Sequence, residues 1–263
     1  PILGYIGHNK EQDNLLLFSQ PKSLISEAFR TIRTNVQYFS QKEKCRVVMI
    51  TSSVGGEGKT FCSMNVASSY ALLKKKTILI GADLRKPRIF DDFGVHNNVG
   101  LSTILIGKAT IEEGTQKTNS EYLDLITSGP IPPNPSELLS SPEFNTLIAT
   151  LKENYDQIIL DTSPIGLVTD AHILINMSDV VLLIVRQKHT RIPNFVKIAK
   201  VLEPYHEKCG VIVNDIQEKR IGYGKYGYGY GYGYGYGYGS YGYGGYGGYG
   251  GYEEKGTLNK KRK

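Results

Sequence analysis

The sequence has no long hydrophobic run. No uninterrupted apolar stretch among its 263 residues approaches the ~20 residues that a membrane-spanning helix needs. No secretory signal peptide is recognisable at its start. The chain begins at Pro1 rather than at a methionine, which suggests a piece cut from a longer protein. We therefore expect a soluble piece, and a membrane segment before Pro1 stays open.

Cysteine is scarce as well. Cys45, Cys62 and Cys209 are odd in number and widely spaced, and none belongs to a C-x-x-C pair or a Cys/His ligand set. This excludes a disulfide framework or zinc ligands read from cysteine spacing and makes a reducing compartment the default. We expect Cys62 to be a small core residue.

The excess of positive charge is modest, at a formal +6. Part of it is the terminal run Lys260–Lys263, which could touch acidic lipid or nucleic acid but is more typical of a solvated chain end. Within residues 222–252, Lys225 is the single cation, so the attraction for a phosphate backbone is missing. We expect no nucleic-acid partner.

What the chain does have is an alternation of short apolar segments and helical patterns. We expect strands at 46–52, 77–83, 122–127, 157–161, 180–186 and 211–215, and helices at 23–39, 59–74, 142–154 and 193–202. Continuously apolar strands between helices indicate an α/β fold with a mostly parallel sheet covered on both faces. In such folds ligands bind at the carboxyl ends of the strands.

The domain organisation follows from composition. Residues 1–21 are mixed and are read as an extended, linker-like arm, residues 22–221 as one α/β domain, and residues 222–263 as a low-complexity tail. Residues 129–141 hold four prolines and are expected to form a stiff surface loop, with Ser136 as a helix N-cap.

A phosphate-binding loop follows the first apolar strand. The Walker A pattern G-x-x-x-x-G-K-[ST] is matched at Gly58, Lys59 and Thr60, with Ser53 in place of the first glycine. Lys59 is expected against the β- and γ-phosphates, and the Thr60 hydroxyl on Mg²⁺. The expected nucleotide-binding residues are Ser53, Gly55, Gly56, Glu57, Gly58, Lys59, Thr60 and Phe61. Asn214 is a candidate for adenine recognition, with a buried structural asparagine as the alternative.

Carboxylates end two later strands. Asp83 follows Ile78–Ala82, and Asp161 follows Ile158–Leu160 in a Walker B arrangement. Such a carboxylate can hold Mg²⁺ or accept a proton from a nucleophile. A turn or helix-cap role is the alternative for Asp83. We expect Lys59, Asp83 and Asp161 to be catalytic, and Thr60, Asp83 and Asp161 to bind the metal.

The tail is almost entirely tyrosine and glycine. Its thirteen tyrosines are Tyr223, Tyr226, Tyr228, Tyr230, Tyr232, Tyr234, Tyr236, Tyr238, Tyr241, Tyr243, Tyr246, Tyr249 and Tyr252. Such a segment cannot bury a core, so we expect it to be disordered with its hydroxyls in water. Reachable hydroxyls beside a nucleotide site indicate an enzyme that phosphorylates its own tail.

Together these residues resemble the bacterial tyrosine kinases that regulate capsule and exopolysaccharide export, a family built on a P-loop ATPase like MinD and ParA. The resemblance covers nearly the whole chain and includes Thr51–Thr60, Asp83–Pro87, Pro133–Leu139, Asp161–Pro164 and the tyrosine cluster. It implies an ATP- and Mg²⁺-dependent protein-tyrosine autokinase. Catalysis would rest mainly on positioning and charge stabilisation.

The resemblance also implies partners. Glu27, Arg30 and Arg33 match a family pattern that mediates ring-like self-assembly, an octamer, in which one subunit's tail enters the neighbour's site. A solvated face with i,i+3 pairing is the alternative. Pro1–Ile6 looks like a juxtamembrane linker, so a membrane-anchored activator in the parent chain, a cognate tyrosine phosphatase and a place at the cytoplasmic face of the cell's inner membrane are expected.

One position departs from the family pattern. The segment that ends at Asp83 usually carries two acidic residues, D-x-D, and here the first is Gly81. Either Asp83 or Asp161 takes over proton removal from the tyrosine, or the chain is slow or inactive. The second hypothesis is therefore a MinD- or ParA-like nucleotide-switched scaffold with a sticky tail.

Overall fold

The computed structural model describes residues 1–11, 13–39, 45–166 and 170–217. These residues fall in one compact unit, Pro1–Lys219. The tyrosine-rich tail lies outside the described residues. Within the described ranges, no helix combines the length and the apolar character needed to cross a membrane.

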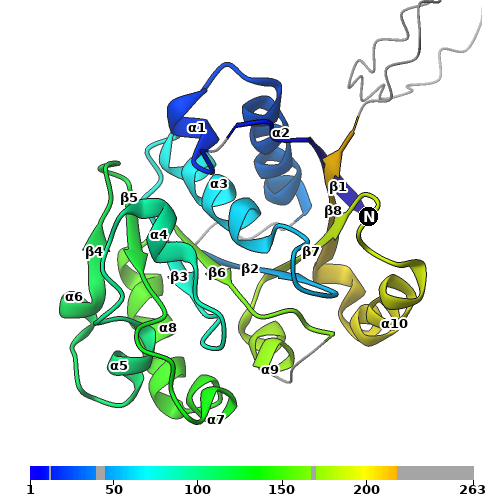
Figure 1. Ribbon diagram of the computed structural model, residues 1–263. Helices are drawn as coiled ribbons and strands as arrows, with labels where there is room; N and C mark the ends of the chain where they lie inside the picture. The colour runs from blue at the N-terminus through cyan, green and yellow to red at the C-terminus, as the bar shows by residue number, and fades with distance from the viewer. Residues whose placement is uncertain (12, 40–44, 167–169, 218–263) are drawn as a thin grey trace, which may run out of the picture. The chain divides into compact units, whose positions relative to one another are not determined.

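An eight-stranded sheet forms the centre of the molecule, in the order β1-β8-β7-β2-β6-β3-β5-β4 (Figure 1). The strands are β1 Ile2–Gly7, β2 Arg46–Ser52, β3 Thr77–Gly81, β4 Thr115–Lys117, β5 Leu123–Ile126, β6 Gln157–Asp161, β7 Val180–Arg186 and β8 Cys209–Ile216. All neighbouring pairs are parallel except β4 and β5. The predicted parallel sheet is confirmed, and the phosphate-binding loop follows its central strand β2.

Helices cover both faces of this sheet. They are α1 Leu16–Ser19, α2 Leu24–Phe39, α3 Lys59–Ala71, α4 Ile89–Phe93, α5 Leu101–Leu105, α6 Ile111–Gly114, α7 Pro135–Leu139, α8 Pro142–Asn154, α9 Asp170–Met177 and α10 Ile192–Leu202. A 3₁₀ turn, Glu203–Lys208, follows α10. Helices α1, α2 and α3 lie on one face, and α7, α8, α9 and α10 on the other (Figure 1).

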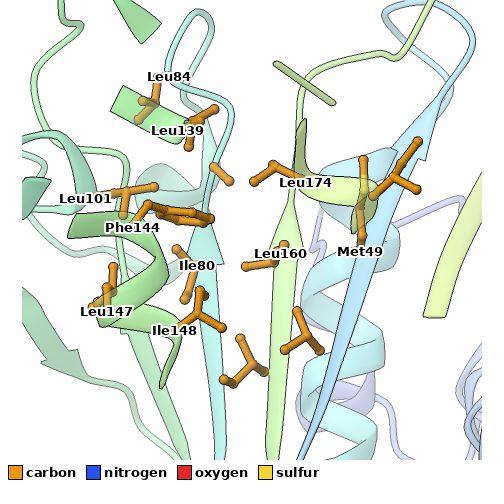
Figure 2. Close-up of a cluster of buried hydrophobic side chains, with 14 of the residues drawn as sticks. Met49, Ile80, Leu84, Leu101, Leu139, Phe144, Leu147, Ile148, Leu160 and Leu174 are labelled. Atoms are coloured by element: carbon orange, nitrogen blue, oxygen red, sulfur yellow. The ribbon is translucent and has the colours of Figure 1, made fainter. Parts of the chain in front are cut away.

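Two hydrophobic cores result, because successive side chains of a strand point to opposite faces. In β2, Val47 and Met49 join the core beneath α8 and α9, whereas Val48 and Ile50 join the core beneath α2 and α3. Figure 2 shows the first core, where Phe144 of α8 packs over the sheet. Burial on both faces explains why the strands read as continuous apolar runs.

The N-terminal segment differs from the expected linker. Residues 2–7 are extended, but they form the edge strand β1, paired in parallel with β8. Leu3 and Ile6 are buried against α2, and Leu17 of α1 is buried in the same core. Pairing and burial tie this segment to the domain, and composition alone did not reveal that.

Two local predictions are also wrong. Residues 129–141 are not all loop, because α7 occupies Pro135–Leu139. Ser136 lies inside that helix, with Asn134 at its N-cap position. The serine that caps a helix here is Ser141, whose hydroxyl accepts a hydrogen bond from the Phe144 amide at the start of α8.

Candidate functional site

The loop between β2 and α3 has the backbone conformation that its glycines allow. Gly56 has φ +82° and Gly58 has φ +93°, in the left-handed region that favours glycine. Gly58 is the N-cap residue of α3, so the helix begins at Lys59. The amino end of α3 and its unpaired N–H groups therefore face the position at which a phosphate would bind.

Glu57 braces this loop from within. Its buried carboxylate accepts hydrogen bonds from the Ser53 amide at 2.6 Å, the Ser53 hydroxyl at 2.7 Å and the Val54 amide at 3.1 Å. The serine in place of the first Walker A glycine thus has a structural partner. The Glu57 side chain is committed to the loop.

The structure brings Lys59, Thr60 and Asp161 together. The Thr60 hydroxyl donates to Asp161 Oδ2 at 2.8 Å, and the Ser63 hydroxyl donates to Asp161 Oδ1 at 3.0 Å. Lys59 is 9% exposed and Asp161 3%. A hydroxyl and a carboxylate at this distance are hard oxygen donors of the kind that Mg²⁺ prefers, and Mg²⁺ usually takes one or two carboxylates plus substrate phosphates. Among the described residues no three His, Cys, Asp or Glu side chains cluster as a fuller metal cage.

Burial raises the pKa of Asp161 to about 6. The charge of Lys59 and the hydrogen bonds from Thr60 and Ser63 oppose this rise, and the charge of Asp83 adds to it. The folded carboxyl therefore binds a proton more tightly than the unfolded one does. Its contribution to stability is fully present below about pH 4 and is lost as the pH rises through about 6.

We expect the substitution Asp161→Asn to stabilise the nucleotide-free protein at pH 7. The shift from 3.8 to about 6 corresponds to at most about 3 kcal/mol, at about 1.4 kcal/mol per pKa unit. Urea unfolding without Mg²⁺ should show this gain at pH 7 and a smaller gain at pH 5. Asp156→Asn, at the other end of β6, is the control. An equal effect of Asp161→Asn at both pH values would contradict this explanation.

Asp83 lies near Asp161, half-buried after β3. Its Oδ1 accepts hydrogen bonds from the Ser163 hydroxyl at 3.0 Å and from the amides of Arg85 and Lys86 at 3.2 and 3.1 Å. This carboxylate therefore holds a turn, as the structural alternative predicts. A role as proton acceptor stays a prediction.

The space that a side chain at position 81 would need is already occupied by neighbouring residues. It pairs with Asp161 across β3 and β6, so a side chain there would point to the same face as Asp161. A Cβ at Gly81 would lie 2.8 Å from the Ser128 hydroxyl, 3.1 Å from the Ser128 amide and 3.3 Å from Ile89. Ser128 thus occupies the space for a first carboxylate, and an acidic side chain at this position would require a shift of Ser128.

A pocket of about 260 Å³ opens beside the loop. Its lining comes from the N-terminal segment, the start of α3 and the ends of β7 and β8, and comprises Gly7, His8, Asn9, Glu11, Asn14, Gly58, Phe61, Arg186, Asn214 and Asp215. The Phe61 ring packs edge-on against Phe29 at 5.6 Å between centroids. Asn214 lies in this lining, but its amide donates to the Glu57 carbonyl at 3.0 Å. The structural alternative for Asn214 is therefore present, and its role toward adenine stays a prediction.

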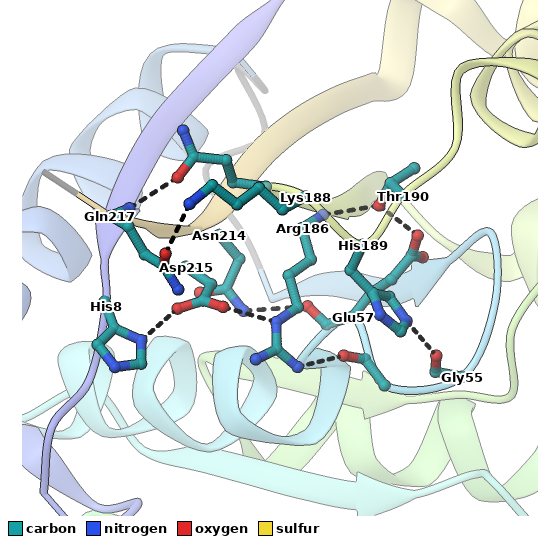
Figure 3. A network of polar contacts seen from close by, with 12 residues as sticks. His8, Gly55, Glu57, Arg186, Lys188, His189, Thr190, Asn214, Asp215 and Gln217 are labelled. Atoms are coloured by element: carbon teal, nitrogen blue, oxygen red, sulfur yellow. Dashed lines mark hydrogen bonds and ion pairs between the residues drawn. The ribbon is translucent and has the colours of Figure 1, made fainter. Parts of the chain in front are cut away.

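Four side chains from the ends of β7 and β8 contact the loop, and sequence reading missed three of them (Figure 3). We call Arg186, His189, Thr190 and Asn214 the collar. Arg186 and Asn214 donate to the carbonyls of Gly56 and Glu57, the His189 ring contacts the Gly55 carbonyl, and Thr190 donates to the Glu57 carboxylate. The signal that the sequence offered for these contacts was the presence of polar residues at the ends of two apolar strands.

The predicted interface residues of α2, Glu27, Arg30 and Arg33, do not form one exposed stripe. Glu27 is exposed and pairs with Arg30, which also donates to the Pro21 carbonyl at 2.6 Å. Arg33 donates to the Ser69 carbonyl of α3 at 2.6 Å, and burial lowers its pKa. The i,i+3 pair of the solvated-face alternative is present, and a subunit interface at α2 stays a prediction.

Known proteins are similar to this chain in sequence. Residues 45–209 match the model of the AAA domain family. The tyrosine-protein kinase YwqD of Bacillus subtilis (strain 168) is 41% identical over 221 residues, which cover 83% of this chain and 93% of that protein. The tyrosine-protein kinase wzc of Salmonella typhimurium (strain LT2) is 35% identical over 82% of this chain but only 30% of its own length.

Solved structures share the fold. The chimerical protein CapA2B2 has a TM-score of 0.78 and 37% identity, covering 83% of this chain and 95% of its own. The kinase domain of the Escherichia coli tyrosine kinase ETK has a TM-score of 0.77 and 28% identity, covering 87% and 95%. MinD of Pyrococcus horikoshii OT3, solved with Mg-ADP, shows a TM-score of 0.53 at 22% identity over 64% and 68%. The predicted MinD-like P-loop fold is confirmed.

Proposed function

This chain belongs to the bacterial tyrosine-protein kinases, and we propose from that premise that it transfers phosphate from ATP to tyrosines in the tail of a neighbouring subunit. The carrying observation is the convergence of Lys59, Thr60 and Asp161 at the carboxyl edge of the sheet. The nucleoside would occupy the pocket that Phe61 and Asn214 line.

The reaction forms one bond and breaks another. The phenol oxygen of an incoming tyrosine attacks the γ-phosphorus in line, the bond from that phosphorus to the β–γ bridging oxygen breaks, and ADP leaves. Loop amides and Lys59 stabilise the charge on the phosphate oxygens. Asp83 accepts the phenol proton on Oδ2, because its Oδ1 already accepts hydrogen bonds from Ser163 and two backbone amides.

Thr60 and Asp161 would hold the metal in this proposal. A bound Mg²⁺ neutralises negative charge on the phosphates. The Thr60 hydroxyl keeps Asp161 Oδ2 oriented toward the amino end of α3. Lys59 also compensates the charge of the buried Asp161 carboxylate.

We place this activity in the control of capsule or exopolysaccharide polymerisation and export. The match covers only 30% of the length of wzc, which supports a larger parent protein, and we propose a membrane-anchored chain-length regulator upstream in it. The kinase would then work at the cytoplasmic face of the cell's inner membrane as a ring-like oligomer, an octamer, with α2 at the interface. A cognate tyrosine phosphatase would reset it.

Phosphorylation is expected to dissociate this assembly. Each phosphotyrosine adds roughly −1.5 to −2 charges at neutral pH. Modification of all thirteen tail tyrosines would therefore add roughly −20 to −26 charges per subunit, and neighbouring tails would repel each other. Light scattering should show a smaller particle after incubation with Mg·ATP. A fully phosphorylated protein that still measures as a ring would contradict this expectation.

The nucleotide-switched scaffold is the second candidate, and Gly81 is the observation that favours it. The test starts from phosphatase-treated protein and follows intact mass in Mg·ATP. An autokinase gains mass in steps of one phosphate, on peptides from 222–252. A scaffold binds ATP and gains none.

The double substitution Gly81→Asp with Ser128→Ala tests whether the missing carboxylate limits the reaction. Ser128→Ala removes the hydroxyl that a Cβ at position 81 would approach. If Asp83 serves as proton acceptor, the wild-type chain is active and the double variant changes its rate by less than about tenfold. A wild-type chain that transfers no phosphate and a double variant that does would support the nucleotide-switched scaffold as the function of the natural sequence. Ser128→Ala alone is the matched control.

A further inference from the structure

The loop is held by its carbonyl oxygens as well as by Glu57. The carbonyls of residues 55–57 each contact a collar side chain, with His189 at 2.9 Å, Arg186 at 2.8 Å and Asn214 at 3.0 Å. In a planar trans peptide the C=O and the following N–H point in opposite directions. Fixing three consecutive carbonyls toward the collar therefore directs the amides of residues 56–58 away from it.

Arg186 is the charged member of this set, and it is itself oriented. Its Nη1 donates to the Gly56 carbonyl at 2.8 Å, and its Nε donates to Asp215 Oδ2 at 2.8 Å. The other Asp215 oxygen contacts His8 Nδ1 at 2.5 Å (Figure 3). A guanidinium is rigid and planar, so holding Nε on a carboxylate fixes the direction of Nη1.

Backbone geometry supports a dedicated role for Asp215. It has φ +60°, a left-handed conformation that non-glycine residues rarely adopt and that gathers at functional sites. Although partial burial opposes it, the hydrogen bonds from His8 and Arg186 hold the pKa of Asp215 below its usual range. The carboxylate is therefore charged at neutral pH and keeps hold of the guanidinium.

We infer that Arg186, oriented by Asp215 and His8, is a positioning residue that sets the phosphate-binding loop through the Gly56 carbonyl. The inference rests on the proposed function, because it requires nucleotide phosphates on that loop. It adds that the segment after β1 is linked to the loop by a continuous chain of side chains. Arg186 acts on phosphates through backbone amides, although it also lines the pocket beside the loop.

The test compares ADP with adenosine. Competition against a fluorescent ADP analogue is measured for the wild-type chain, Arg186→Gln, Asp215→Asn and the double variant. Arg191→Gln removes the same charge from an exposed residue five positions along and is the matched control. Asn is chosen at position 215 because it tolerates the left-handed conformation.

Arg186→Gln should weaken ADP binding about tenfold, the effect of losing one charge-assisted hydrogen bond. It should weaken adenosine binding by a smaller factor, because Arg186 also lines the pocket. Asp215→Asn should weaken ADP binding by a smaller factor than Arg186→Gln does. The fold-loss of ADP affinity in the double variant should be smaller than the product of the two single fold-losses. Unchanged ADP affinity in Arg186→Gln, or an equal loss for adenosine, would overturn the inference. A wild-type chain that binds no ADP would overturn the proposed function and this inference with it.

Hydrogen exchange at saturating ADP, where the phosphates protect the loop amides, gives a second readout. The amides of residues 56–58 should exchange faster in Arg186→Gln, while those of β2 stay as protected as in the wild-type chain. Unchanged exchange in the loop would overturn the inference. If Arg186→Gln does not fold, Arg186→Lys replaces it, because one ammonium cannot reproduce both ends of the guanidinium fork.

Discussion

The Lys59→Met chain is expected to transfer phosphate about 1,000-fold more slowly than the wild-type chain, the upper range for removing one preorganised donor. Lys59 is 9% exposed and opens α3 directly after the left-handed Gly58. Methionine fills similar space without the charge that would stabilise the phosphate oxygens. Initial rates of phosphotyrosine formation measure the effect.

Lys75→Met is the matched control, because Lys75 is exposed and lies beyond the end of α3. This variant should keep the wild-type rate within about twofold, as expected for an exposed position away from the site. Thermal unfolding of both variants checks that they fold. A Lys59→Met chain with near wild-type activity would place the chemistry away from this loop.

Asp161→Asn is expected to lower transfer by a similar factor, about 1,000-fold, because it removes charge from the carboxylate that we propose as a metal ligand. The Asp161 carboxylate accepts the Thr60 and Ser63 hydroxyls and is 3% exposed, so the substitution changes charge with little change in shape. The same substitution is expected to stabilise the nucleotide-free protein at pH 7. Loss of activity together with gain of stability is the signature of a carboxylate buried for function.

Two controls separate charge from hydrogen bonding. Ser63→Ala removes one neutral donor to Asp161 and should cost less than about tenfold in rate, as expected for a single hydrogen bond. Asp156→Asn makes the same change of charge at the opposite end of β6 and should leave the rate unchanged. Equal losses in Ser63→Ala and Asp161→Asn would mean that geometry, rather than charge at Asp161, supports transfer.

Local signals predicted much of the fold and the centre of the site. The apolar run at 157–161 and the helical pattern at 142–154 predicted β6 and α8 with the bounds observed. The loop glycines predicted a turn before Lys59. The parallel sheet then placed Asp161 against Thr60, although 101 residues separate them in the chain.

The sequence did not predict contacts between residues that lie far apart in the chain. His189 meets Gly55 across 134 residues, and Arg186 meets Gly56 across 130. The sequence around His189 or Arg186 has no local pattern that indicates which residue it contacts. The pairing of β1 with β8 was not predicted for the same reason, because the sequence of a six-residue edge strand does not differ from that of an unpaired extended segment. The fit of Ser128 against Gly81 depends on the three-dimensional register of β3 and β5.

Transfer between two distinguishable chains tests whether one subunit phosphorylates the tail of another. Wild-type chain labelled with ¹⁵N serves as donor, and unlabelled Lys59→Met chain, which retains the whole tail, serves as acceptor. Both are phosphatase-treated, mixed with Mg·ATP and followed by intact mass, which separates the two. We expect stepwise phosphate gain on the unlabelled chain, on tyrosines from Tyr223 to Tyr252. An unlabelled chain that gains no phosphate would contradict it.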